Sequence, residues 1–135
     1  MSPVLVDSNV LLDLSTRDTA WGQWSRAAVR TLADRAVLVI NPIIYGEISA
    51  DFARIEHVDD TFPPSAFRRE PLPYEAAFLA AKCHRDYRRR GGVRVSVLAD
   101  FLIGAHAAIR GYQLLTRDAR RYRTYFPRLS LVTPE

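Results

Sequence analysis

The sequence predicts an α/β protein, a three-layer sandwich in which a central, mostly parallel sheet is flanked by helices. Short segments rich in Val, Ile and Leu alternate with longer segments of helical periodicity. Such alternation is typical of a parallel sheet covered on both faces. The chain has 135 residues, of which 48% are hydrophobic, enough for one ordinary core. We therefore expect a single domain over residues 1–135.

The first elements follow from the residue pattern. Val4–Val6 is short and β-branched, as expected of a buried strand. Residues 18–35 carry apolar side chains at spacings of three and four, which predicts a helix. Residues 36–40 form a second apolar strand. A helix is predicted over residues 41–55, because it begins with Asn in the capping position and Pro in the first turn.

The middle of the chain is less regular. Residues 56–73 are rich in proline and charge, which predicts a long loop with no more than a short turn of helix. Residues 74–90 are helical and end at a glycine pair. Residues 93–96 are predicted to be a short strand. Val97–Arg110 is an alanine-rich helix closed by Gly111.

The last third of the chain repeats the alternation. A strand is expected at residues 112–116, a short helix at 119–125 and a final strand at 129–132. Ligands of such sheets bind beyond the carboxyl ends of the strands. Asp7, directly after the first strand, is therefore expected at the functional edge of the sheet.

Four acidic residues occupy comparable places. Asp7 and Asp118 follow predicted strands, Asp100 lies early in the helix after residues 93–96, and Glu47 lies on the helix after the second strand. Carboxylates gathered on one edge repel one another, and a hard divalent cation removes that repulsion. Mg²⁺ or Mn²⁺ held there can activate water for attack on a phosphodiester. No His and Cys spacing typical of a zinc site is present.

Each acid also has a purely structural interpretation. Asp7, or Asn9, can cap the following helix. Glu47 can be a solvated helix residue. Asp100 can favour the positive end of its helix, and Asp118 can form a turn. The joint placement of the four acids on one predicted edge is what favours a site.

Charge and composition point to further partners. The net charge is +4, almost entirely from arginine, which suits a polyanion such as RNA. The candidates for phosphate contact are Arg85, Arg88, Arg89 and Arg117, and the alternative for each is a solvated surface position. A single cysteine and the absence of a long apolar run indicate a cytoplasmic protein that does not enter a membrane.

Four motifs resemble one known family. They are "VDSNVLLD", "INPIIYGEI", "LADFLIGAHA" and "LLTRDARRYRTYFPRLSLVTP", and together they cover nearly the whole chain. In this order they resemble the PIN-domain ribonucleases, and most closely the VapC toxins of VapBC toxin–antitoxin systems.

The resemblance implies a PIN fold and Mg²⁺- or Mn²⁺-dependent endonucleolytic cleavage of RNA by water. It places the metal-binding and catalytic acids at Asp7, Glu47, Asp100 and Asp118. Asn9 and Thr116 match the polar residues that orient those carboxylates or their waters. It also implies a homodimer and a complex with a small VapB-like antitoxin.

Three other classes of protein share part of this sequence pattern. A phosphoacceptor receiver domain needs a late lysine at a strand end, but Lys82, the only lysine, falls within a predicted helix. A phosphatase with an aspartate nucleophile needs a second aspartate where Asn9 stands. A catalytically silent PIN module that binds RNA or protein remains as the alternative.

Overall fold

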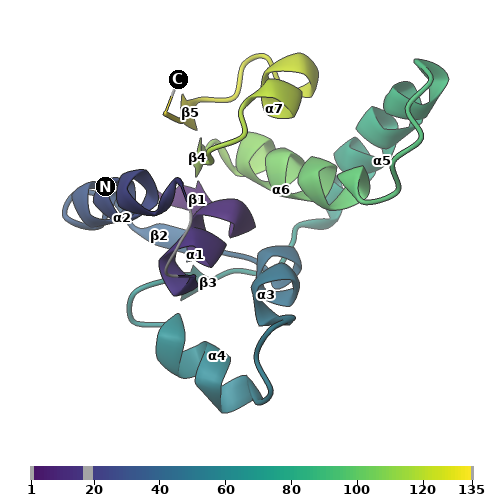
Figure 1. Cartoon of the computed structure of the whole chain (residues 1–135). Helices are drawn as coiled ribbons and strands as arrows, with labels where there is room; N and C mark the ends of the chain where they lie inside the picture. Colours follow the sequence, from purple (N-terminus) through teal and green to yellow (C-terminus); the bar gives the residue numbers. More distant parts are fainter. Residues whose placement is uncertain (1, 17–19, 135) are drawn as a thin grey trace.

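Five parallel strands form the centre of the molecule. The computed structural model describes residues 2–16 and 20–134 (Figure 1). The strands are β1 (Val4–Val6), β2 (Leu38–Ile40), β3 (Arg68–Arg69), β4 (Gln113–Leu115) and β5 (Leu131–Val132). Their order across the sheet is β3-β2-β1-β4-β5, and every neighbouring pair is parallel. The predicted fold class is confirmed, with β1 as the central strand.

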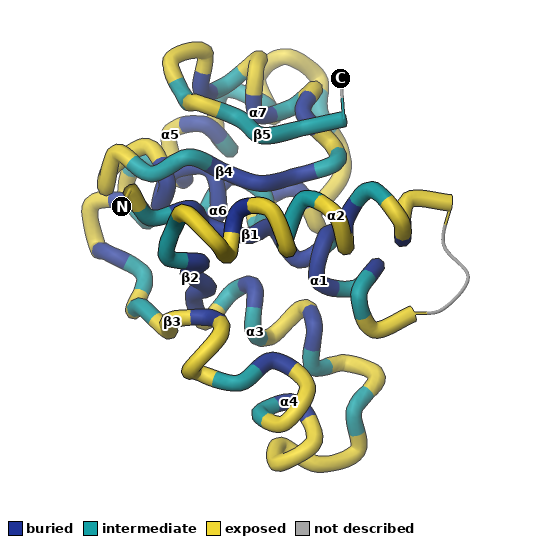
Figure 2. Tube along the Cα trace, turned by 90° about the vertical axis from the view of Figure 1, so that its left-hand side faces the viewer, coloured by how far each residue is buried: buried dark blue, intermediate teal, exposed yellow. Residues whose placement is uncertain are grey.

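Seven helices connect the strands of the described residues. They are α1 (Ser8–Ser15), α2 (Gly22–Ala33), α3 (Pro42–Ser49), α4 (Ile55–Thr61), α5 (Tyr74–Arg89), α6 (Val97–Arg110) and α7 (Arg120–Tyr125). Helix α2 lies on one side of the sheet, and α5 and α6 lie on the other (Figures 1 and 2). The sheet is therefore the middle of three layers. Residues 18 and 19 of the helix predicted over residues 18–35 lie outside the described residues.

The inner strands supply the core. Leu5, Val39 and Leu114 are fully buried at neighbouring positions of β1, β2 and β4 (Figure 2). The three strands are apolar on both faces because helices cover both faces of the sheet. Their carboxyl ends meet at one edge of the sheet, which is where the chain turns into α1, α3 and the segment before α7.

The structure differs from the predictions for residues 93–96 and for residues 56–73. The strand predicted at residues 93–96 is wrong, because that segment pairs with no strand and its Val93 and Val95 are 88% and 85% exposed. The sheet instead gains the strand β3, which lies within residues 56–73, the stretch predicted as a loop. Its two arginines are recognisable as a strand only through their pairing with β2.

The helix predicted over residues 41–55 is too long. Asn41 caps α3 as expected, with its Oδ1 accepting the N–H of Ile44 at 2.9 Å, but α3 ends at Ser49. The chain then turns, and the Phe52 ring packs edge-on against Phe62, with ring centroids 6.4 Å apart. This contact brings α4 under the sheet. No helix in residues 2–16 and 20–134 combines the length and apolar character needed to cross a membrane.

Candidate functional site

Asp7 lies directly after β1 and is only 3% exposed. Its Oδ1 accepts the backbone N–H of Ser8 at 2.8 Å, so the capping role is present. Its Oδ2 accepts hydrogen bonds from the hydroxyls of Thr116, at 2.9 Å, and Tyr122, at 2.8 Å. The same carboxylate therefore begins a helix with one oxygen and ties β1 to the C-terminal segment with the other.

The two predicted orienting residues lie beside Asp7. The amide of Asn9 donates to Asp7 at 3.4 Å and to the hydroxyl of Thr116 at 3.2 Å. Thr116 is fully buried at the end of β4 and also accepts the backbone N–H of Asp118 at 3.1 Å. Thr116 thus fixes both Asp7 and the turn that carries Asp118.

Glu47 reaches the site from helix α3. Glu47 as a whole is exposed, but its Oε1 accepts a hydrogen bond from the hydroxyl of Ser8 at 2.7 Å. The same hydroxyl lies 3.5 Å from Asp7 Oδ1. Ser8 therefore stands between two of the predicted acids.

Asp100 enters from helix α6, in its first turn. It does not follow a strand as predicted, because residues 93–96 are not a strand. Its Oδ2 accepts the guanidinium of Arg121 at 2.6 Å. Asp118 is exposed and follows β4, and its negative charge raises the pKa of Asp100.

The four acids influence one another electrostatically. Burial raises the pKa of Asp7 to about 6, and the charges of Asp100 and Glu47 push in the same direction against the hydrogen bonds from Tyr122 and Thr116. Burial also raises the pKa of Glu47, with a further contribution from Asp100. Burial raises the pKa of Asp100 although Arg121 opposes the shift. The structure thus gathers the acids on one edge of the sheet.

Sequence reasoning missed two residues of α7. Tyr122 is 2% exposed and its hydroxyl touches Asp7, and Arg121 pairs with Asp100. Burial raises the pKa of the Tyr122 phenol well above its usual range, and the negative charges of Asp7 and Asp100 add to this. The sequence signal that could have identified Arg121 and Tyr122 was the position of their helix directly after Asp118, at the edge where ligands of parallel sheets bind.

The predicted arginines occupy two places. The guanidinium of Arg117 lies 2.9 Å from the buried carboxylate of Asp13, which also accepts the hydroxyl of Ser25 at 2.7 Å. Arg117 is therefore held against the protein. A shallow groove of about 590 Å³ lies along the end of α5. It is lined by Arg85, Arg88 and Arg89 together with Ala81, His84 and Leu98.

The donor set suits a hard cation. All four acids offer carboxylate oxygens, the ligands that Mg²⁺ and Mn²⁺ prefer. Their mutual effect on pKa shows that negative charge is concentrated where a cation relieves it. As the side chains lie, no three His, Cys, Asp or Glu residues among those described converge closely enough to hold an ion. Release of Arg121 from Asp100 would free a further carboxylate oxygen for a cation.

A buried polar network lies behind the helix that carries Glu47. The amide of Asn41 lies 2.9 Å from His106 Nδ1, and His106 Nε2 lies 2.6 Å from Glu70. Tyr112 donates to the other oxygen of Glu70 at 2.7 Å. Because Asn41 uses its Oδ1 on Ile44, its amide NH₂ faces His106, and the imidazole proton is on the nitrogen that faces Glu70. The network joins the start of α3 to α6 and to the end of β3.

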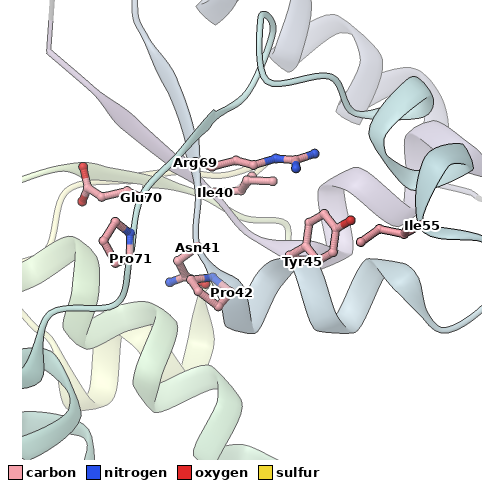
Figure 3. A pocket seen from close by; sticks show the side chains of 8 residues that line it. All are labelled: Ile40, Asn41, Pro42, Tyr45, Ile55, Arg69, Glu70 and Pro71. Carbon is pink, nitrogen blue, oxygen red and sulfur yellow. The ribbon is translucent and has the colours of Figure 1, made fainter.

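An apolar cleft opens next to this network. Figure 3 shows Tyr45, Ile55 and Arg69 around it, and its volume is about 490 Å³. None of the four predicted acids lines it. The cleft is thus separate from the acidic edge of the sheet.

The fold has close structural relatives. VapBC2 from Rickettsia felis, bound to a DNA fragment from its promoter, matches with a TM-score of 0.74 and 14% identity over 98% of this chain and 99% of that chain. VapBC-1 from nontypeable Haemophilus influenzae matches with a TM-score of 0.72 and 15% identity over 97% of both chains. A toxin–antitoxin complex from Klebsiella pneumoniae matches with a TM-score of 0.68 and 21% identity over 98% of both chains.

At these identities the likeness shows the shared fold. No curated protein sequence matches the chain significantly. The family model described as "PIN domain" matches residues 4–127, a span that contains all four acids. The chain belongs to the PIN domain family.

Proposed function

We propose that the chain is a single PIN domain that acts as a Mg²⁺- or Mn²⁺-dependent endoribonuclease. One observation carries the proposal. Asp7, Glu47, Asp100 and Asp118 come from distant segments of a PIN fold, yet the charges of Asp100 and Glu47 raise the pKa of Asp7 and the charge of Asp118 raises that of Asp100. Such an arrangement costs stability and is of use when a cation is bound.

The residues divide the work as follows. Asp7 and Asp100 hold the metal directly, Asp118 holds it directly or through water, and Glu47 holds a water or a second metal. When bound, the metal supplies an activated water and stabilises the charge of the phosphodiester under attack. Thr116 and Tyr122 fix one oxygen of Asp7 by hydrogen bonds. These bonds leave the position of that carboxylate little freedom.

Other side chains prepare the surroundings. Ser8 orients Glu47 through its 2.7 Å hydrogen bond, and Asn9 links Asp7 to Thr116. Arg85, Arg88 and Arg89 of α5 offer guanidinium groups along a groove to the RNA backbone.

We further propose that this nuclease is the toxin of a VapBC-type pair. The support is the fold shared with VapBC2 of Rickettsia felis and with the Klebsiella pneumoniae toxin–antitoxin complex. The expected partners are a VapB-like antitoxin and a second copy of the chain. The protein then acts in the cytoplasm, where its RNA substrate is found.

A second function has two observations in its favour. Arg121 neutralises Asp100 at 2.6 Å, and the described side chains do not form a ready ion site. A PIN module that binds RNA or protein without cutting would show both features. It would need no release of Arg121.

Cleavage of labelled RNAs, including a structured tRNA pool, separates the two functions. The purified protein is incubated with Mg²⁺, Mn²⁺ or EDTA, and Asp7→Asn and Asp100→Asn are run beside it. Cutting that needs metal and is lost in both variants supports the nuclease. RNA that is bound but never cut, with no heat of metal binding in calorimetry, favours the silent module. Cutting that survives in both variants rejects the site.

A further inference from the structure

Another hollow, distinct from the groove along α5 and from the apolar cleft, opens directly beside Asp118. Its volume is about 420 Å³, and it is lined from α5, α7 and the loop before α6. Its lining side chains include three arginines, Arg94, Arg120 and Arg121, two tyrosines, Tyr87 and Tyr125, and Asp118 itself. The hollow therefore adjoins the acidic edge and has the opposite charge.

The two tyrosines are firmly placed. Both rings pack edge-on against the fully buried Phe101, with centroids at 5.9 Å for Tyr87 and 4.8 Å for Tyr125. Gly92 lies against the ring of Tyr87 so closely that a Cβ there would come within 2.3 Å of it. The Tyr87 hydroxyl accepts the backbone N–H of Arg94 at 3.2 Å. The aromatic walls are thus held in position before any ligand arrives. The guanidinium groups of Arg90 and Arg121 lie over the rings of Tyr125 and Tyr87, at 5.5 Å and 6.0 Å from the ring centroids, so a base that stacks there displaces them.

The arginines differ in how they are engaged. Arg121 pairs with Asp100. The guanidinium groups of Arg94 and Arg120 are exposed and make no ion pair within 4.0 Å and no side-chain hydrogen bond to the described residues. The charge of Arg94 nevertheless reaches the site, since it lowers the pKa of Asp100. Two cations are thus available to a ligand that also lies near the acids.

This combination fits one ligand class. Guanidinium groups bind phosphate through paired hydrogen bonds, and an aromatic face stacks on a nucleobase of any sequence. We propose that the hollow formed by Tyr87, Arg94, Arg120 and Tyr125 is a nucleotide subsite. It holds the phosphate and base next to the scissile bond of a single-stranded RNA, and it rests on the proposed nuclease function for the role of the neighbouring acids.

Binding can be tested without cleavage. The affinity of the full chain for a short fluorescein-labelled single-stranded RNA of mixed sequence is measured by anisotropy in EDTA at several salt concentrations. Arg94→Gln and Arg120→Gln should each weaken binding about tenfold, and each should reduce the slope of log affinity against log salt by about 0.7. Arg35→Gln is the matched control, since Arg35 is exposed at the opposite end of β2. It should change neither quantity.

The stacking wall has its own pair of variants. Tyr125→Leu should weaken RNA binding about tenfold, whereas Tyr125→Phe keeps the ring and should keep the affinity. Melting temperatures confirm that each variant is folded. If Arg94→Gln and Arg120→Gln bind RNA as tightly as the unmodified chain and Arg35→Gln do, the subsite is rejected. A protein partner is then the remaining occupant of the hollow.

The subsite and the nuclease can fail separately. A chain that cuts RNA in Mg²⁺ but binds it equally well in all variants overturns the subsite alone. A chain that shows the expected binding pattern in EDTA but never cuts RNA keeps the subsite and overturns the nuclease.

Discussion

The guanidinium of Arg121 lies 2.6 Å from the carboxylate of Asp100, and the next residue, Tyr122, donates its hydroxyl to Asp7 at 2.8 Å. Two consecutive side chains of the short helix α7 thus contact two acids, one directly after β1 and the other in helix α6. The first contact is ionic and half-open to water, with side-chain exposures of 22% and 33%. The second is a buried hydrogen bond. Helix α7 therefore controls both the charge and the geometry of the site.

Removal of the Arg121 charge should favour metal binding. A cation that binds Asp100 must first displace the guanidinium, and a partly exposed ion pair of this kind is worth up to about 1 kcal/mol. Arg121→Gln should therefore bind Mn²⁺ about fivefold more tightly in calorimetry. Arg35→Gln, which changes the net charge equally but lies far from the acids, serves as the control. Equal gains in both variants would mean that only the overall charge matters.

Asp7→Asn should stabilise the metal-free protein above pH 6. The pKa of Asp7 is raised by burial from 3.8 to about 6, so the folded state binds more protons than the unfolded state between these values. Stability from this group is complete at low pH and is lost as the pH rises through about 6. The loss amounts to about 3 kcal/mol at neutral pH. Urea unfolding of both proteins at pH 4 and pH 8 should show the gain at the higher pH.

The exposed Asp51 provides the comparison for this experiment. Asp51→Asn should change the free energy of unfolding by less than about 0.5 kcal/mol. Addition of Mg²⁺ should raise the stability of the original chain and not that of Asp7→Asn. A variant less stable than the original chain at pH 8 would show that the burial of this charge is not costly.

Tyr122→Phe should shift the titration of Asp7 upward. The phenol hydrogen bond lowers the pKa of Asp7 against the larger effect of burial, so its loss moves that pKa above about 6. The acid limb of the pH–activity profile, or the carboxyl chemical shift of Asp7 in NMR, should move to higher pH. Tyr45→Phe removes a phenol that donates to the surface carboxylate of Asp59 instead and should leave the profile in place. An unmoved acid limb in Tyr122→Phe would show that another group governs it.

The buried histidine should matter for stability. His106→Leu leaves the amide of Asn41 and one oxygen of Glu70 without their partners, which should cost about 3 kcal/mol in the free energy of unfolding. Partial burial raises the pKa of Glu70, but hydrogen bonds from His106 and Tyr112 outweigh it and the net shift is downward. The stability from Glu70 is therefore present above its usual pKa of 4.5 and is lost as the pH falls through the lowered value.

Unfolding across this acidic range tests the same network. The original chain should lose stability below the usual pKa of Glu70 more steeply than His106→Leu does. Tyr112→Phe, which removes a single donor to Glu70, should lie between them. Identical slopes for all three proteins would count against this role of the network.

The sequence allowed the β1 end of the site to be predicted and left its C-terminal side incomplete. Asp7 could be placed because polar residues directly after apolar strands meet at one edge of a parallel sheet. Asn9 and Thr116 were expected from the family resemblance, and both contact Asp7. Tyr122 could not be placed, since an aromatic residue on a short helix is equally compatible with the core. Its hydroxyl contact with Asp7 arises only in the tertiary structure.

The errors in secondary structure have a similar cause. Val93 and Val95 have the β-branched character of a strand, but no neighbouring strand pairs with them. Arg68 and Arg69 have the opposite character and form β3, because β2 offers them its free edge. Strands this short are specified by their partners, and those partners are distant in the sequence.

The bond between Tyr122 and Asp7 joins residues 115 positions apart, and β1 pairs with β4 over a similar separation. During synthesis the ribosome releases β1 first, and the central strand must wait for the last fifth of the chain before one of its two sheet neighbours exists. A nascent chain therefore carries its first acid long before it carries a completed site. For a protein proposed to cut RNA, this order of assembly delays any cutting until β4 and α7 have been translated.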